Sequence, residues 1–163
     1  MNLQELKSKV ERIILNLKDN GIFPKENNHI DYKSELKIQA SKTEVENFLL
    51  NFAKDIISFS NSDGGIIFLG ITEEKITGQH NDVGLKPKDI DILRKIDLND
   101  VTQQFEKITK IGVSIDLQQF QISTRKFYYL VIEKNNQILI PQKDYPHLKL
   151  LNGGIYYRAS SKN

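Results

Sequence analysis

The chain has 163 residues, 39% hydrophobic and 27% charged, which suits one globular domain, and its net charge of +2 does not by itself indicate a polyanionic partner. It contains no cysteine, which excludes disulfide bonds, thiol catalysis and zinc sites built from thiolates. No apolar run approaches the roughly 20 residues that span a bilayer, and the N-terminus lacks a secretory signal, so we expect a cytoplasmic protein with no membrane partner.

The first element in the chain is an amphipathic helix over residues 3–20, which Gly21 and Pro24 end. We expect residues 1–29 to form an N-terminal helix and linker, followed by one domain over residues 30–163. The helix either covers the sheet of that domain or mediates contacts in a homo-oligomer. Its apolar residues recur at intervals of three and four: Leu3, Leu6, Val10, Ile13, Ile14 and Leu17.

Residues 30–38 alternate between charged and apolar side chains, a pattern that predicts a strand. The charged face either lies half exposed to solvent or directs two carboxylates and two lysines into a cleft. Its residues are Asp31, Lys33, Glu35 and Lys37.

A long apolar stripe next predicts a core helix over residues 43–61. Ser41 and Thr43 each precede a glutamate by three residues, so either residue can form a capping box at the start of this helix.

The helix breaks in a glycine-containing turn, and an entirely apolar strand follows over residues 66–69. Such a run is typical of a strand covered on both faces, so we expect it to be central in the sheet. The turn is too short for a linker, and we expect a positive φ at Gly64 or Gly65.

Weaker patterns follow the central strand. We expect a short strand near Ile76 and a loop over residues 79–87. Helical periodicity predicts two short helices, over residues 89–95 and 100–108, with Asn99 as the N-cap of the second.

From Ile111 the apolar residues alternate, which predicts strands in the rest of the chain, apart from a loop over residues 142–154. The alternation changes phase, so we expect a bulge near residues 118–119. The order of elements predicts an α+β fold with a mixed, largely antiparallel sheet packed with helices. The later predicted elements are a turn at 123–124, a strand over 127–133, a hairpin turn at 135–136, and strands over 137–140 and 155–158.

Several enzyme classes lack their sequence signals. The chain has neither the phosphate loop of nucleotide-binding enzymes nor a Gly-x-Ser-x-Gly nucleophile elbow. The three histidines lack the paired spacing of metal ligands, and we interpret them as surface residues: His29, His80 and His147.

Four motifs resemble the Schlafen AlbA-like domain family, over roughly residues 30–160. The resemblance implies nucleic-acid binding, and some Schlafen proteins are endoribonucleases that act on structured RNA. The motifs are Glu35-Leu36-Lys37, SFSNSDGGIIFLGI at 58–71, Glu73-Glu74 with Ile76-Thr77-Gly78, and Ile155-Tyr156-Tyr157-Arg158.

The first functional hypothesis is binding of RNA or DNA through a basic face. Residues 107–163 hold nine Lys or Arg against three Asp or Glu, a bias that favours contact with phosphates. A tyrosine beside an arginine can add base stacking to a phosphate contact. The residues that we predict for this face are Lys33, Lys37, Arg125, Lys126, Tyr157 and Arg158.

The second hypothesis is a metal-dependent endoribonuclease, which the resemblance implies. It makes Glu35, Glu73 and Asp31 catalytic and Glu35 and Glu73 ligands of Mg²⁺ or Mn²⁺, which prefer hard oxygen ligands. Asp31 lies one residue away from the spacing expected of the family. The two glutamates can meet if the strands that precede them are parallel neighbours. A third hypothesis is a protein-interaction or regulatory module without nucleic-acid contact.

Overall fold

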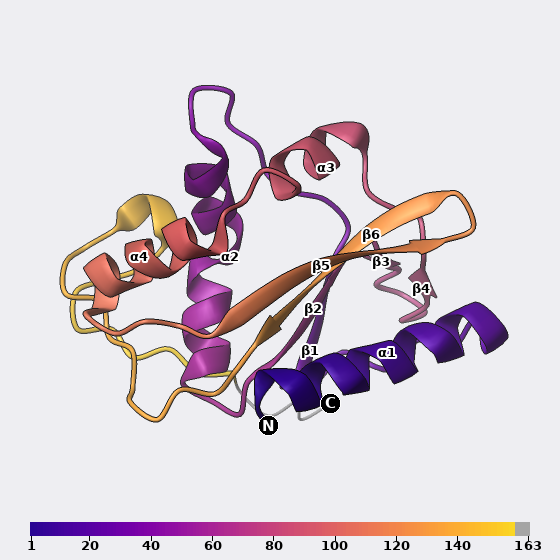
Figure 1. The fold of residues 1–163 in the computed structure, drawn as a ribbon, viewed down its shortest axis with the longest axis horizontal. Helices are drawn as coiled ribbons and strands as arrows, with labels where there is room; N and C mark the ends of the chain where they lie inside the picture. Colours follow the sequence, from indigo (N-terminus) through magenta and orange to yellow (C-terminus); the bar gives the residue numbers. More distant parts are fainter. Residues whose placement is uncertain (159–163) are drawn as a thin grey trace.

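The computed structural model describes residues 1–158 and contains a four-stranded sheet in the order β1-β2-β6-β5 (Figure 1). Strands β1 and β2 are parallel, and the other two pairs are antiparallel. The predicted α+β fold, the mixed sheet and the central position of the apolar strand are therefore confirmed. The strands are β1 (Ile30–Lys33), β2 (Gly65–Leu69), β5 (Ile115–Ile122) and β6 (Arg125–Ile132).

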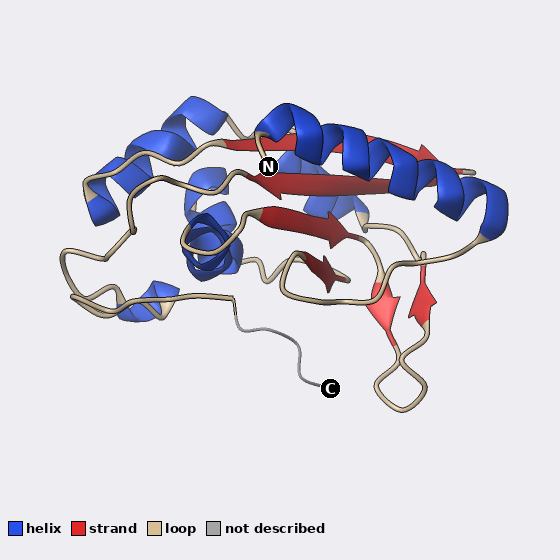
Figure 2. Ribbon diagram, turned by 90° about the horizontal axis from the view of Figure 1, so that it is seen from below, coloured by secondary structure: helices blue, strands red, loops and turns tan. Residues whose placement is uncertain are grey.

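Helices cover both faces of the sheet (Figure 2). In the fully buried strand β2, Ile66 and Phe68 pack in the cluster that contains α1, while Ile67 and Leu69 pack in the cluster that contains the other helices. This two-sided burial explains why the strand is apolar throughout. The helices are α1 (Leu3–Asn20), α2 (Glu44–Ser60), α3 (Pro87–Leu93) and α4 (Leu98–Thr109).

The two long helices begin and end as their sequences predict. Asn2 caps α1 by accepting from the amide of Glu5 at 2.9 Å, and Gly21 ends the helix with a φ of 66°. Of the two candidate capping boxes for α2, the one between Thr43 and Glu46 forms. Helix α1 covers the sheet, and no helix among the described residues is both long and apolar enough to cross a bilayer.

The turn between α2 and β2 requires glycine. Gly64 has a φ of 75°, as predicted for one of the two glycines, and its amide donates to the carbonyl of Phe59 at 2.9 Å. A Cβ atom at Gly64 would lie 2.6 Å from the carbonyl oxygen of Ile132, and one at Gly65 would lie 2.3 Å from the ring of Phe59. The chain therefore passes between β6 and the end of α2 at a distance that no side chain permits.

Two predictions for the first half of the chain are wrong: the length of the first strand and the short strand near Ile76. The strand predicted over 30–38 ends at Lys33, because the next backbone amides donate to side chains instead of to a neighbouring strand: Leu36 donates to Asp89 and Lys37 donates to Asn51. The strand predicted near Ile76 is a hairpin of β3 (Thr72–Glu73) and β4 (His80–Asn81), and Ile76 lies 94% exposed near its tip. Strand β4 also falls inside the predicted loop.

Helix α4 and strand β5 differ from prediction in detail. Asp97, and not Asn99, caps α4, and its side chain accepts from the amide of Asn99 at 2.9 Å. The predicted bulge is absent, because β5 and β6 pair in unbroken register. The apolar residues change phase because Leu117 packs on one side of the sheet and Phe120 on the other. The turn at 123–124 is present, with Ser123 at a φ of 57°.

The strands predicted over 137–140 and 155–158 are absent. Asn61, at the end of α2, takes the place of a partner strand for both segments. Its side chain accepts from the amide of Leu139 at 2.7 Å and donates to the carbonyls of Leu139 and Tyr156, each at 3.0 Å. A short 3₁₀ turn, η1 (Pro146–Leu148), lies between the two segments.

Candidate functional site

A row of polar side chains on α2 lines a groove. Asn51, Lys54, Asp55 and Ser58 are spaced by three or four residues and therefore share one face of the helix. Two hollows, of about 490 and 530 Å³, adjoin this face and share Lys54 and Asp55. We call the two together the α2 groove.

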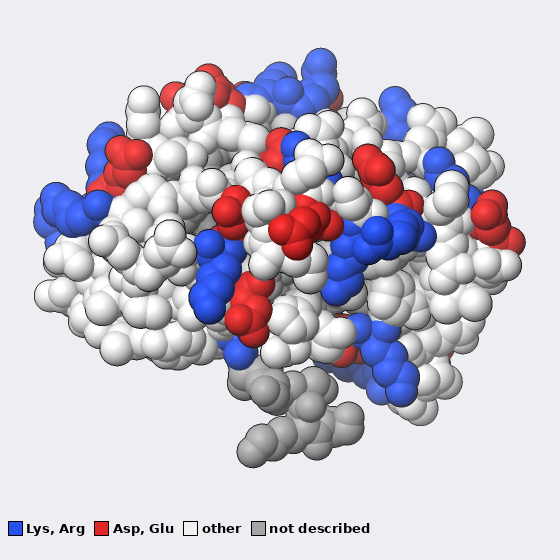
Figure 3. Space-filling model, turned by 60° about the horizontal axis from the view of Figure 1, so that its bottom comes forward, with Lys and Arg blue, Asp and Glu red and all other residues white. Residues whose placement is uncertain are grey.

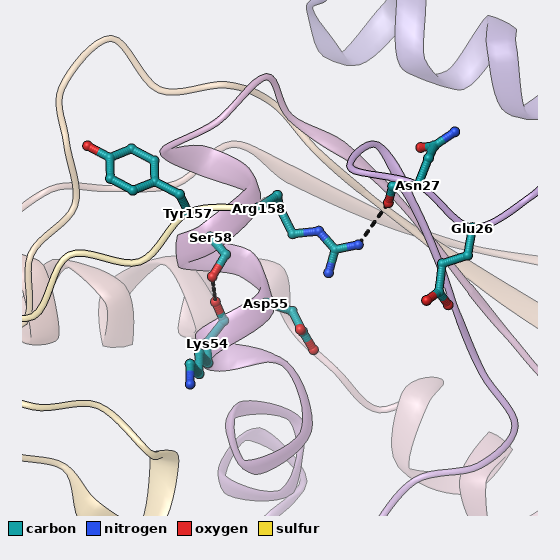
Figure 4. Close-up of a pocket in the computed structure, with 7 residues that line it drawn as sticks. All are labelled: Glu26, Asn27, Lys54, Asp55, Ser58, Tyr157 and Arg158. Atoms are coloured by element: carbon teal, nitrogen blue, oxygen red, sulfur yellow. Dashed lines mark hydrogen bonds between the residues drawn. The ribbon is translucent and has the colours of Figure 1, made fainter. Parts of the chain in front are cut away.

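The first part of the groove, the Arg158 hollow, is shown in Figure 4. It lies where the end of α2, the segment before β1 and the C-terminal segment meet. Its lining residues are Glu26, Asn27, Lys54, Asp55, Ser58, Tyr157 and Arg158.

The second part, the Lys37 hollow, lies between α2, the segment that follows β1, and η1. Its charged lining residues are four lysines and two acids: Lys33, Lys37, Lys54, Lys149, Glu35 and Asp55.

Arg158 is held on three sides. Its Nη2 donates to the carbonyl of Asn27 at 2.9 Å, its backbone amide donates to Ser62 Oγ at 2.8 Å, and its guanidinium lies 4.4 Å from the centre of the Phe59 ring. A cation over an aromatic face is attracted by the ring quadrupole. The end of α2 therefore fixes an arginine that lies almost a hundred residues away in the sequence.

Three lysines of the groove have no carboxylate partner among residues 1–158: Lys37, Lys54 and Lys149. The backbone of Lys37 is fixed by Asn51, whose side chain accepts from its amide and donates to its carbonyl, each at 2.8 Å. Lys54 Nζ lies 5.2 Å from the centre of the Tyr156 ring. Lys149 follows η1 with a φ of 59°.

Asp55 is the acidic residue common to both hollows. Its Oδ2 pairs with Lys33 Nζ at 3.2 Å, and its side chain is 24% exposed. Burial raises the pKa of this carboxyl group, and the nearby Asp31 raises it further, whereas Lys33 and Arg158 oppose the shift. The α2 groove therefore contains side chains of both charges. Figure 3 shows that Lys and Arg also alternate with Asp and Glu across one face of the molecule.

The structure places the predicted binding residues in two regions. Tyr157 and Arg158 line the Arg158 hollow, and Lys33 and Lys37 line the Lys37 hollow. Arg125 and Lys126 line a different hollow of about 650 Å³, between the start of β6 and α3. There, Arg125 Nη2 pairs with Asp82 Oδ2 at 2.7 Å.

The predicted catalytic carboxylates are also divided. Glu35 is exposed, and Lys86, at 3.1 Å, lowers its pKa through a hydrogen bond and its charge. Asp31 and Glu73 lie near Glu26, a residue that the sequence did not single out. Desolvation, a hydrogen bond to Asp31 and the charge of Glu73 raise the pKa of Glu26 to about 7.

Glu73 has a further neighbour. His80 Nε2 lies 2.8 Å from Glu73 Oε2, although the two are not aligned as a hydrogen bond. The His80 side chain is 7% exposed and its ring lies 4.4 Å from that of Tyr32, so the prediction of a surface histidine is wrong here. Among residues 1–158, no group of three or more His, Asp or Glu is arranged to hold a metal ion. The two predicted ligands of Mg²⁺ or Mn²⁺ have separate partners in the structure, Lys86 for Glu35 and His80 for Glu73.

The sequence alone did not identify several lining residues. The apolar stripe dominates the sequence pattern of α2, so Lys54 and Asp55 did not stand out. Their spacing from Asn51 and Ser58 was the signal that could have identified them. Glu26 and Lys149 lie in irregular segments, and no periodicity places such residues in space.

Comparison with known proteins agrees with this architecture. Residues 26–163 match the family described as Schlafen, AlbA_2. The N-terminal domain of a protein related to the ATP-dependent DNA helicase RecG, from Nitrosomonas europaea, is 17% identical with a TM-score of 0.50, over 93% of this chain and 89% of that domain. The DIP2311 protein of Corynebacterium diphtheriae is 17% identical with a TM-score of 0.49; the match covers 85% of this chain, which spans 27% of that protein. No curated protein matches the sequence.

Proposed function

This chain belongs to the Schlafen AlbA_2 family, and we propose that it binds nucleic acid through the α2 groove. The observation that carries this proposal is the set of three lysines in the groove, Lys37, Lys54 and Lys149, for which residues 1–158 supply no carboxylate. A phosphate can pair with each of them without breaking an ion pair inside the protein. Phosphate contacts of this kind supply most of the affinity of sequence-independent binding.

The rigidity of the groove supports the same proposal. Arg158 is held by Asn27, Ser62 and Phe59, so its position is determined before any ligand arrives. Binding then loses less side-chain freedom than it would with a mobile arginine. The fold is also similar to a domain of a protein whose name relates it to a DNA helicase.

Fluorescence polarisation with labelled RNA and DNA at low salt tests the proposal. We expect the wild-type protein to bind both, and Lys54→Glu to weaken binding on all sequences alike. The matched control is Lys107→Glu, which changes the charge equally at an exposed position of α4 that lines none of these hollows. Absence of binding by the wild-type protein would contradict the proposal and favour the protein-interaction module instead.

A second candidate function is cleavage of structured RNA. The observation that favours it is the carboxyl group of Glu26, which lies beside Asp31 and Glu73 and has its pKa raised to about 7. A group with such a pKa can accept and return a proton near neutral pH, as general acid–base catalysis requires. We expect cleavage of a folded RNA to disappear in Glu26→Gln while binding persists. A wild-type protein that binds the RNA and leaves it intact would exclude this function.

A further inference from the structure

We propose that the Arg158 hollow receives one unpaired guanine base, which stacks on Tyr157 and donates hydrogen bonds to Asp55. This inference rests on the proposed function and extends it, because it names single-stranded nucleic acid with an accessible guanine as the ligand. The hollow has a volume of about 490 Å³, within the range of about 300 to 1,000 Å³ that is typical of small-molecule sites.

The charges of the two hollows favour different parts of a nucleotide. The Lys37 hollow contains four lysines and two acids, whereas the Arg158 hollow contains two cations and two carboxylates. Carboxylates repel a phosphate and accept hydrogen bonds from the N–H groups of a base. The phosphates of a bound strand therefore lie in the Lys37 hollow, and one base enters the Arg158 hollow.

Tyr157 provides the stacking surface. The residue is 55% exposed, so its ring is accessible to a ligand. Its neighbour Tyr156 has a structural role instead, since its hydroxyl group accepts from the amide of Leu151 at 2.9 Å. In Figure 4, the Tyr157 ring and the Arg158 side chain extend to opposite sides of the hollow. Stacking on an exposed aromatic ring is how single-strand binders hold an unpaired base.

Asp55 selects the base. Its carboxylate extends from α2 into the space between Arg158 and Glu26 (Figure 4), and one oxygen is paired with Lys33. An ionised carboxylate only accepts hydrogen bonds. Guanine presents two adjacent donors, the ring N–H and the exocyclic amino group, which match the two carboxylate oxygens. Uracil presents one N–H between two carbonyl oxygens, and these would face the carboxylate with like partial charge.

The test compares labelled oligouridine with the same oligomer carrying one central guanosine, and with that oligomer annealed to its complement. We expect the guanosine oligomer to bind about tenfold more tightly than oligouridine, because a good bidentate contact discriminates between bases on this scale. Annealing should remove this advantage, since it pairs the guanine edge and holds the base in the stack.

Two substitutions locate the effect. Asp55→Asn should abolish the preference for guanosine over oligouridine, because it replaces an acceptor oxygen with a donor. Tyr157→Ala should weaken the binding of both single-stranded oligomers, because it removes the stacking ring. Tyr157→Phe keeps the ring and should leave both affinities unchanged. Tyr157 is exposed, so neither change at this position should alter the melting temperature of the protein.

The two proposals fail in different ways. Equal affinity for both single strands in the wild-type protein would overturn the base pocket, and so would a guanosine preference that survives Asp55→Asn. If Lys54→Glu still weakens binding in that case, the groove remains a nucleic-acid site without base selection. Absence of binding to every oligomer would overturn the proposed function, and the base pocket with it.

Discussion

The guanidinium of Arg158 lies 4.4 Å from the centre of the Phe59 ring, and this contact joins the last described residue to the end of α2. Two residues shortly after Phe59 extend the junction: the Asn61 side chain bonds the backbone of Leu139 and Tyr156, and Ser62 accepts from the amide of Arg158. The motif that ends α2 therefore shapes the Arg158 hollow through Phe59, Asn61 and Ser62, and its first residue, Ser58, lines that hollow.

Replacing Asn61 by Ala should lower the free energy of unfolding by about 3 kcal/mol, because it leaves one amide and two carbonyls without their partners. Urea unfolding measures this loss. Asn136→Ala, an exposed position, is the matched control and should change stability by less than about 0.5 kcal/mol. Equal stability of the two variants would mean that Asn61 does not hold the C-terminal segment.

Gly64 and Gly78 both have a positive φ and differ in the space around them. A Cβ at Gly64 would meet the carbonyl oxygen of Ile132 at 2.6 Å, whereas a Cβ at Gly78 would meet nothing within 4 Å. We therefore expect Gly64→Ala to cost about 3 kcal/mol and Gly78→Ala only the cost of the left-handed backbone, about 1 kcal/mol. Similar losses in thermal unfolding would contradict the close approach of β6 to this turn.

The pKa of Glu26 makes stability depend on pH. Its pKa is raised from 4.5 to about 7 in the folded protein, so the folded state binds the proton more tightly than the unfolded state. The stabilisation by this proton is complete below about pH 4.5 and is lost as the pH rises through about 7.

We expect Glu26→Gln to remove the loss of stability that the wild-type protein shows as the pH rises. Between about pH 5 and about pH 8, the variant should gain about 1 kcal/mol over the wild type, a value reduced for solvent screening because Glu26 is an exposed residue. Urea unfolding at the two pH values measures it, with Glu11→Gln on the outer surface of α1 as the control. A constant difference between variant and wild type would show that Glu26 does not titrate in this range.

Helix α1 lies outside the region that matches the family, yet it packs into the sheet. Leu6 is 2% exposed and Leu15 is 62% exposed, so the same substitution tests both sides of one helix. Leu6→Ala should lower the free energy of unfolding by about 3 kcal/mol, and Leu15→Ala by less than about 0.5 kcal/mol, as urea unfolding would measure. If neither variant is destabilised, α1 does not contribute to the core and is available for contacts with other molecules.

The sequence predicted those parts of the fold that have strong periodicity. The stripe of α2, the apolar run of β2 and the glycine turn between them each depend on local geometry, and all three are present. It failed where side chains replace regular backbone pairing, as Asn61 does for the C-terminal segment. It also inferred a bulge in β5 from a change of phase, because it did not foresee that Leu117 and Phe120 pack on opposite faces of the sheet.

The candidate site was predictable only in part. Arg158 and Tyr157 follow one another in a recognisable motif, and the structure places both in one hollow. The grouping of Lys54 with Lys37 and Lys149 depends on how three distant segments pack, and charge counts along the chain do not contain this information. The same packing gives Glu35 a partner, Lys86, that the sequence did not indicate.

The salt dependence of binding tests the central claim most directly. We expect the slope of log affinity against log salt to decrease by about 2 when Lys37, Lys54 and Lys149 are all replaced by Glu, because each lost phosphate contact removes about 0.7 from the slope for a single strand. The control replaces Lys18, Lys75 and Lys107, which line none of these hollows and give the same net charge. A smaller slope and weaker binding in the groove variant alone would place the phosphates in the α2 groove. Equal slopes in the two variants would contradict that placement.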